Sequence, residues 1–236
     1  MTDTTEHSVL RPQPSALVLD RLRSRYGPLP WHPHGDPLTE LVLTILSQHT
    51  NDTNSGRAFT AMQRAFPSWD EVLAAEPSAL ADSIRQGGLA NQKAPRIQQV
   101  LARIKEERDG WEIDFLAGLP LDEAKQWLRS LPGVGPKTAA CVLMFALGRP
   151  ALPVDTHVYR VARRLGLIED KTTPEQAHAL LEAQIPPGET YAFHIALIKH
   201  GRHTCTARTP RCGDCPLNDI CPSAFRVGRL ASLPPQ

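Results

Sequence analysis

Four cysteines stand close together in the last part of the chain, in the pattern C-x6-C-x2-C-x5-C: Cys205, Cys212, Cys215 and Cys221. Thiolate sulfur is a preferred ligand of zinc and of iron–sulfur clusters, and four thiolates complete either kind of site. Zinc modules usually present two C-x2-C pairs, whereas these four cysteines, called the cysteine ladder below, contain only one. The spacing therefore favours a 4Fe–4S cluster over zinc. A disulfide framework is the least favoured, because the total of five cysteines is odd.

The segment around these cysteines is the most cationic part of a chain whose formal charge is only +1. Net charge therefore gives no support for a nucleic-acid partner, and only the local distribution of cationic residues can indicate one. We expect Arg202, Arg208 and Arg211 to contact phosphate, because a metal-bound loop would fix their positions. A solvated loop that keeps its charges outside the ligand cage is the alternative that this stretch leaves open.

A glycine-containing turn with the sequence Leu-Pro-Gly-Val-Gly-Pro-Lys-Thr spans residues 131–138. Gly133 and Gly135 permit a close approach of backbone to a ligand, and Val134 between them can plug the junction of two helices. Such a helix-hairpin-helix turn exposes amides that bind phosphate, although an ordinary helix connection is possible. Lys137 would lie in the first turn of the second helix, where the positive end of the dipole disfavours the protonated amine. The turn therefore predicts a nucleophilic lysine.

An acidic residue follows the hairpin in the sequence Val-Asp-Thr-His, residues 154–157. Asp155 is well placed to cap a helix, which explains its presence without any catalytic role. If it also faces the cleft of Lys137, its carboxylate can accept a proton or stabilise a developing sugar cation. The two roles are compatible, and His157 is the neighbouring candidate for DNA contact.

Helices must position these groups, because apolar residues recur at helical spacing from residue 15 onward without a convincing strand pattern. We therefore predict an all-α fold. Cys141, inside an apolar segment, is expected to be a buried small hydrophobe, and Trp69, Trp111 and Trp127 to be core or boundary residues. The expected helices span residues 36–47, 68–75, 93–107, 121–130, 137–147, 155–165 and 190–200, with Gly148, Gly166 and Gly201 as stops.

The 236-residue chain is long enough for one large domain or two small ones. Residues 1–14 are expected to form a disordered polar tail and residues 223–236 a loose one. No run is apolar enough to span a bilayer, and residues 1–14 lack the features of a signal peptide. We expect a cytoplasmic protein, without a membrane partner, that acts as a monomer.

The hairpin lysine, the Val-Asp-Thr-His acid and the cysteine ladder, in this order, resemble endonuclease III of the helix-hairpin-helix glycosylase superfamily, over about residues 15–222. The resemblance implies two helical lobes with double-stranded DNA in the cleft between them. One is a six-helix lobe of residues 29–149. The other is a 4Fe–4S cluster lobe of residues 15–28 and 150–222.

The resemblance further implies a DNA glycosylase with AP-lyase activity that acts on a damaged base or an abasic site. Lys137 would attack C1′ of a flipped nucleotide, displace the base, form a Schiff base and nick the strand by β-elimination, with help from Asp155. Leu89 matches the family's apolar wedge, and Gln48 and His49 lie in the segment that enters the duplex from the other side. Oxidised pyrimidines are the expected lesions, although Gln48-His49 and Ala90 differ from the family pattern of Ala-Gln and an aromatic residue.

Three alternatives stay open at this point. A monofunctional or mismatch-specific glycosylase would share the fold and the cluster but lack an amine in the hairpin, so Lys137 argues against it. A non-catalytic DNA-binding iron–sulfur protein would use Lys137 only as a cation. A simple electron carrier would need no hairpin lysine.

Overall fold

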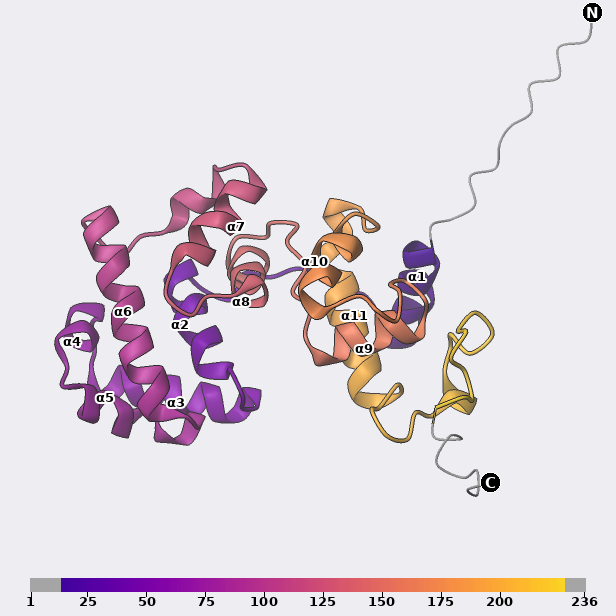
Figure 1. Cartoon of the computed structure of the whole chain (residues 1–236), viewed down its shortest axis with the longest axis horizontal. Coiled ribbons are helices and arrows are strands. Elements are labelled where there is room, and N and C mark those ends of the chain that lie inside the picture. The colour runs from indigo at the N-terminus through magenta and orange to yellow at the C-terminus, as the bar shows by residue number, and fades with distance from the viewer. Residues whose placement is uncertain (1–13, 228–236) are drawn as a thin grey trace, which may run out of the picture.

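The computed structural model describes residues 14–227, and every regular element within them is helical (Figure 1). The all-α fold predicted from the sequence is confirmed. Two groups of helices lie side by side, α2 to α8 in one lobe and α1 with α9 to α11 in the other (Figure 1). Helix α1 therefore packs against α11, from the opposite end of the chain.

The first lobe holds ten short or medium helices. They are α2 (Pro37–Ser47), α3 (Asp52–Ala65), α4 (Trp69–Ala74), α5 (Pro77–Ser83), η1 (Arg85–Gly87), α6 (Ala90–Arg108), η2 (Asp114–Ala117), α7 (Leu121–Ser130), α8 (Pro136–Cys141) and η3 (Val142–Ala146). The elements of the second lobe are α1 (Pro14–Tyr26), α9 (Thr156–Arg164), α10 (Pro174–Glu182), η4 (Pro187–Glu189), α11 (Thr190–His203) and η5 (Cys212–Asp214).

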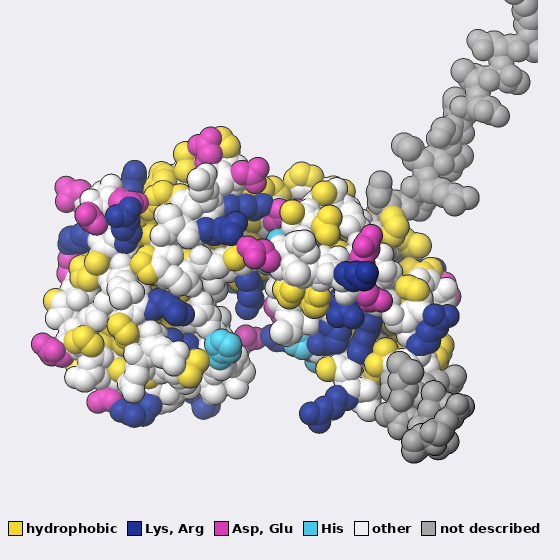
Figure 2. Space-filling view, viewed as in Figure 1, with side chains coloured by type: hydrophobic (Ala, Val, Ile, Leu, Met, Phe, Trp, Pro, Cys, Tyr) yellow, Lys and Arg dark blue, Asp and Glu magenta, His cyan; other side chains and the backbone are white. Residues whose placement is uncertain are grey.

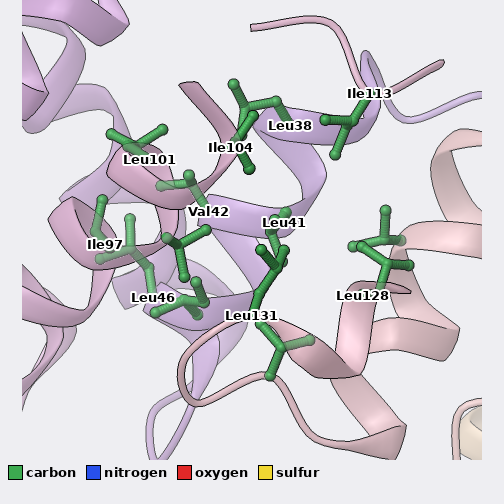
Figure 3. Close-up of a cluster of buried hydrophobic side chains, with 14 of the residues drawn as sticks. Leu38, Leu41, Val42, Leu46, Ile97, Leu101, Ile104, Ile113, Leu128 and Leu131 are labelled. Atoms are coloured by element: carbon green, nitrogen blue, oxygen red, sulfur yellow. The ribbon is translucent and has the colours of Figure 1, made fainter. Parts of the chain in front are cut away.

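Each lobe is built around its own cluster of buried apolar side chains. In the first, α2 presents leucines and a valine to α6 and α7. Figure 3 labels side chains of this cluster from these helices and from the segments beside them: Leu38, Leu41, Val42, Leu46, Ile97, Leu101, Ile104, Ile113, Leu128 and Leu131. Burying each one stabilises the fold by about 1.5–3 kcal/mol. The chain leaves the first cluster at Ala151 and enters the second at Leu152, so the lobes meet along a short connection.

Several helix ends follow from local sequence. Asp36 caps α2 by accepting a hydrogen bond from the Thr39 amide at 2.8 Å, with Pro37 as the first helical residue. Ser68 caps α4 in the same way. Helix α7 begins and ends where the sequence predicted. The helices α3, α5 and α10 lay outside the predicted set, although Asn51 caps α3 and Thr173 opens α10 with a capping box.

The helix predicted over residues 137–147 is only partly α-helical. It is α-helical to Cys141 and then widens into the π-helix η3. Two residues of the segment before α2 donate hydrogen bonds to carbonyl groups of this π-helical turn. Trp31 Nε1 donates to Met144 O at 2.8 Å, and the His34 amide donates to Phe145 O at 3.2 Å. Competition of this kind opens the regular helical ladder, and π-turns are frequent at functional sites.

The sequence predicted that Gly201 ends α11. This prediction is wrong, because the helix continues to His203. A Cβ atom at residue 201 would stand 2.9 Å from Cβ of His157, so the missing side chain lets α9 and α11 approach closely. Gly148 and Gly166, in contrast, follow η3 and α9 with φ of 62° and 71°, in the left-handed region that favours glycine. These two residues do end their helices.

The two predicted tails fall largely on residues 1–13 and 228–236, outside the described residues. Pro14, expected in the first tail, is the first residue of α1, and residues 222–227 form turns. Among the helices of residues 14–227, none has the length and apolar character needed to cross a membrane. The boundaries of the two domains stay predictions.

A buried lysine joins α2, η1 and α6. Lys93 is 2% exposed, and its ammonium donates to Leu46 O at 2.6 Å and to Gly87 O at 2.7 Å. Both carbonyl groups lie at helix ends, where backbone acceptors lack helical partners. Lys93 therefore holds together the two turns that follow α2 and η1.

We expect Lys93→Met to lower the free energy of unfolding by about 2–4 kcal/mol, because two carbonyl groups lose their donor while the aliphatic volume is kept. Urea denaturation monitored by far-ultraviolet circular dichroism measures this change. Lys105→Met, which removes an ion pair between half-exposed side chains, is the control and should cost at most about 1 kcal/mol. Equal losses in the two variants would contradict the role given to Lys93.

Candidate active site and metal centre

The connection between the lobes, residues 149–155, is held from the first lobe by Arg149. Its guanidinium donates to Leu116 O at 2.9 Å, to Ala117 O at 2.6 Å and to Leu119 O at 2.8 Å. A planar fork with several donors suits such a cluster of carbonyl groups. Nothing in the sequence around Arg149 signalled this anchoring role.

The second lobe holds the same connection through buried and partly buried side chains. His178 Nδ1 lies 2.8 Å from Leu152 O, and His194 Nδ1 lies 2.9 Å from Pro153 O. Burial lowers the pKa of His194 to about 4, so its ring is neutral near pH 7. Glu182 accepts from the Leu152 amide at 2.7 Å and pairs with Lys125 of α7 at 2.5 Å. The backbone leading into Asp155 is therefore fixed relative to both lobes.

A cleft of about 710 Å³ lies between the lobes, and Figure 2 shows the hollow with Lys, Arg and His side chains on its rim. The first lobe contributes residues 47–53 and Lys137. The second contributes residues 154–157, Tyr159, Pro174 and Arg202. The structure thus brings the predicted nucleophile and the predicted acid to one cleft.

Lys137 and Asp155 reach the cleft from opposite sides of the connection. Lys137 is exposed in the first turn of α8, whereas Asp155 is half-buried at the start of α9. Asp155 Oδ1 accepts from the Val158 amide at 2.7 Å, which confirms the predicted capping role. Its Oδ2 has no hydrogen-bond partner within residues 14–227 and remains available to a ligand.

The hairpin turn before α8 has the expected form. Gly133 has φ of 71°, and the side chain of Arg96 packs so tightly against it that a Cβ atom would stand 2.3 Å from Nε of Arg96. Val134 is 5% exposed and its amide donates to Leu131 O, so it fills the junction between α7 and α8. Gly135, at the start of α8, has open space where a Cβ would lie. Open space beside the backbone is therefore found at Gly135, whereas Arg96 covers Gly133, and phosphate binding by this turn stays a prediction.

The two segments expected to enter the DNA lie next to each other. Leu89 is 46% exposed in a left-handed turn, with φ of 51°. His49 is also exposed with positive φ, whereas Gln48 is held by Arg96 at 3.1 Å. Lys93 donates to both Gly87 O and Leu46 O, and thereby links the Leu89 turn to the turn at residues 47–50. Their contacts with DNA stay predictions.

The predicted phosphate-binding cations differ in their surroundings. Arg202 pairs with Asp52 at 2.9 Å, across the mouth of the cleft between α11 and α3. His157 lines the cleft and its Nδ1 lies 3.0 Å from Arg160. Arg208 is exposed beyond α11, and Arg211 donates to the carbonyl of His203. The structure places only Arg202 and His157 in the cleft itself.

The four cysteines of the ladder line one cavity beside α9 and α11. Arg164 Nη1 lies 3.3 Å from Cys205 Sγ, and His200 Nε2 lies 3.5 Å from Cys215 Sγ. Burial lowers the pKa of His200 to about 4, so it is neutral and its Nδ1 can accept from Tyr26 at 3.2 Å. Such N–H groups stabilise thiolates that hold an iron–sulfur cluster. Cys141 is far from this ladder and buried, as predicted.

The four thiols of the cavity are a donor set that suits an iron–sulfur cluster. Within residues 14–227, no three His, Cys, Asp or Glu side chains form a group that could hold a single metal ion. Zinc would draw four sulfurs to about 2.3 Å from one point. A 4Fe–4S cluster instead takes one thiolate at each iron, so its ligands stay further apart. Cys205, Cys212, Cys215 and Cys221 fit this group.

Comparisons with known proteins agree with this geometry. Residues 42–187 match the model of the HhH-GPD superfamily base excision DNA repair proteins, and residues 205–221 match the iron–sulfur binding domain of endonuclease III. Endonuclease III of Thermotoga maritima is 33% identical over 84% of this chain and 88% of its own length. A candidate DNA glycosylase of Arabidopsis thaliana is 40% identical over 70% of this chain, which spans 56% of that longer protein.

Solved structures extend the likeness to the whole fold. A non-covalent endonuclease III–DNA complex superposes with a TM-score of 0.78 at 29% identity, over 92% of this chain and 98% of the other. A trapped endonuclease III–DNA covalent intermediate gives a TM-score of 0.79 with the same coverage. The chain therefore belongs to the HhH-GPD superfamily of base excision DNA repair proteins. Within it, the chain is a DNA-binding glycosylase of the endonuclease III type, with a 4Fe–4S cluster.

We expect freshly purified protein to contain iron and inorganic sulfide in equal amounts and to absorb visible light. The reason is the cavity lined by four cysteines, because four thiolates complete the ligand set of a 4Fe–4S cluster. Metal analysis by mass spectrometry, with sulfide determination, measures this. Cys215→Ser should lose the visible band, while Cys141→Ser, outside the ladder, should keep it. Stoichiometric zinc without iron would contradict the assignment.

Proposed function

We propose that the protein is a bifunctional DNA glycosylase and AP lyase that removes oxidised pyrimidines such as thymine glycol from duplex DNA. The observation that carries the proposal is the position of Lys137 and Asp155, which line the same cleft from opposite lobes. An amine in this cleft distinguishes the proposal from a monofunctional glycosylase, which needs none.

In the proposed reaction, the lone pair of Lys137 Nζ forms a bond to C1′ of an everted nucleotide. The glycosidic bond breaks, and its electron pair leaves with the base, which gains a proton. Opening of the sugar ring then gives an imine between Lys137 and C1′. Loss of a proton from C2′ expels the 3′ phosphate by β-elimination and nicks the strand. Hydrolysis of the imine releases Lys137.

Asp155 supports this sequence through its free carboxylate oxygen. Positive charge develops on the sugar as the base leaves, and a fixed negative charge nearby lowers the energy of that state. The same oxygen can accept the proton that Lys137 loses. The 4Fe–4S cluster takes no part in these steps, and we propose that its cysteines hold the cationic segment of residues 202–211 toward the DNA.

The nucleotide must leave the base stack before Lys137 can reach C1′, which costs a few kcal/mol. Leu89 is an exposed apolar side chain on a rigid turn, which suits a wedge that fills the vacated space. Gln48 and His49 would contact the strand from the other side. We also propose that the protein acts as a monomer in the cytoplasm.

Incubation with an abasic-site duplex and sodium borohydride should give a covalent protein–DNA adduct, because hydride reduces the imine to a stable amine. Lys137→Ala should abolish the adduct. Lys171→Ala removes an exposed lysine outside the cleft and is the matched control, so its yield should equal that of the unaltered protein. Iron-loaded protein that binds the duplex and yet never cross-links would rule out the lyase.

Asp155→Asn should lower single-turnover base release by about 100-fold or more, with DNA affinity within about threefold, because the charge acts on the developing cation. Asparagine caps a helix as well as aspartate, so the melting temperature should stay the same. Asp155→Ala is the comparison that also loses the cap. Equal losses of affinity and rate in Asp155→Asn would count against a catalytic carboxylate.

A further inference from the structure

A second cavity, of about 400 Å³, shares Lys137 and Asp155 with the DNA cleft. Its other lining residues come from the segment before α2, from α2 itself, from α3, from α8 and η3, and from α11. A base released from C1′ has to lie within reach of both Lys137 and Asp155. The cavity is therefore the space beside the reactive groups into which a base can extend.

Flat side chains form one wall of this cavity. His34 stacks on Phe145, with ring centroids 4.6 Å apart and planes 13° from parallel. The edge of Phe145 meets His194 at 5.6 Å. The His34 amide also donates to Phe145 O at 3.2 Å, which ties the segment before α2 to η3. Such a wall suits a planar heterocycle.

Glu40 is the polar group of the cavity that the sequence did not single out. It projects from α2, and its side chain is 8% exposed. Oε1 accepts from the Thr44 hydroxyl at 3.1 Å. Oε2 has no hydrogen-bond partner within residues 14–227, and His34 Nδ1 lies 3.9 Å from it. One oxygen is thus fixed as an acceptor, and the other is left for a ligand.

Burial raises the pKa of Glu40 to about 7, against a smaller opposing effect of the Thr44 hydrogen bond. The charged groups that line the same cavity are Asp52, Lys137, Asp155 and Arg202. Arg202 is paired with Asp52. The remaining titratable groups are uncharged near neutral pH, because burial lowers the pKa of His34 and His194 and raises that of the Cys141 thiol.

We propose that Glu40 is a specificity-determining residue that reads the everted base, with Oε2–H as donor and Oε1 as acceptor. This inference rests on the proposed function, since it concerns the base that Lys137 displaces. A protonated carboxyl presents a donor and an acceptor side by side. The complementary partner is a pyrimidine edge in which an N3–H stands next to a carbonyl group, as in oxidised or reduced thymine and uracil.

Glutamine keeps the same pair of groups, because its Nε2 donates and its Oε1 can still accept from Thr44. Glu40→Gln should therefore excise thymine glycol within about threefold of the unaltered protein. Glu40→Leu fills similar volume without either group and should be slower by at least about tenfold, because the buried edge of the base stays unpaired. Both rates are measured under single-turnover conditions.

A substrate variant tests the same contact from the other side. N3-methylated thymine glycol lacks the N–H, so the unaltered protein should excise it at least about tenfold more slowly. Glu40→Leu should then show little further loss between the two bases. Nicking and borohydride trapping at an abasic site, which has no base to read, should be equal in all three proteins.

Two results would overturn the inference while the proposed function stands. If Glu40→Gln is as slow as Glu40→Leu, the carboxyl acts through proton transfer and not through a hydrogen-bonded pair. If Glu40→Leu excises both bases at the rates of the unaltered protein, Glu40 does not contact the base. Failure of the unaltered protein to nick or trap abasic DNA is a different result, which defeats the proposed function itself.

Discussion

The short connection at residues 149–155 is the constraint on which the site depends. Each lobe has its own apolar cluster, so neither core fixes the position of the other. Arg149 holds the connection to three carbonyl groups of the first lobe, and His194, His178 and Glu182 hold it from the second. Since Asp155 ends this segment, its position relative to Lys137 depends on these hydrogen bonds together with the burial of Ala151, Leu152 and Val154 in the two clusters.

The turns on the DNA side are organised in a similar way. Lys93 binds the carbonyl groups that end α2 and η1, and Arg96 contacts both Gln48 and Gly133. One face of α6 therefore supports three loops that come from separate parts of the sequence. Rigid support of this kind keeps loop residues in position without ligand, which reduces the free energy lost on binding.

Local signals in the sequence predicted much of this molecule. Asp36 and Asp155 cap their helices because an aspartate before an apolar periodic segment needs no tertiary contact to do so. The spacing of the four cysteines likewise predicted an iron–sulfur cluster without any knowledge of the fold. Glu40 and Lys93 gave no such signal, because both lie on helices where a charged residue normally faces solvent. Their burial arises from distant neighbours, as does the π-turn, which depends on donors at Trp31 and His34.

The pair between Arg202 and Asp52 bears on how DNA binding responds to ionic strength. The salt dependence of DNA binding comes from counterions displaced from the phosphates, and it grows with the number of protein cations that neutralise them. Arg202 is already paired with Asp52 in the protein. If the Arg202 side chain bound a phosphate instead, the Asp52 carboxylate at the lip of the cleft would lose its partner. The net charge delivered to the duplex is then smaller than a count of arginines suggests. If Arg202 binds a phosphate, the affinity should therefore fall less steeply with added salt than it would for an arginine without an internal partner.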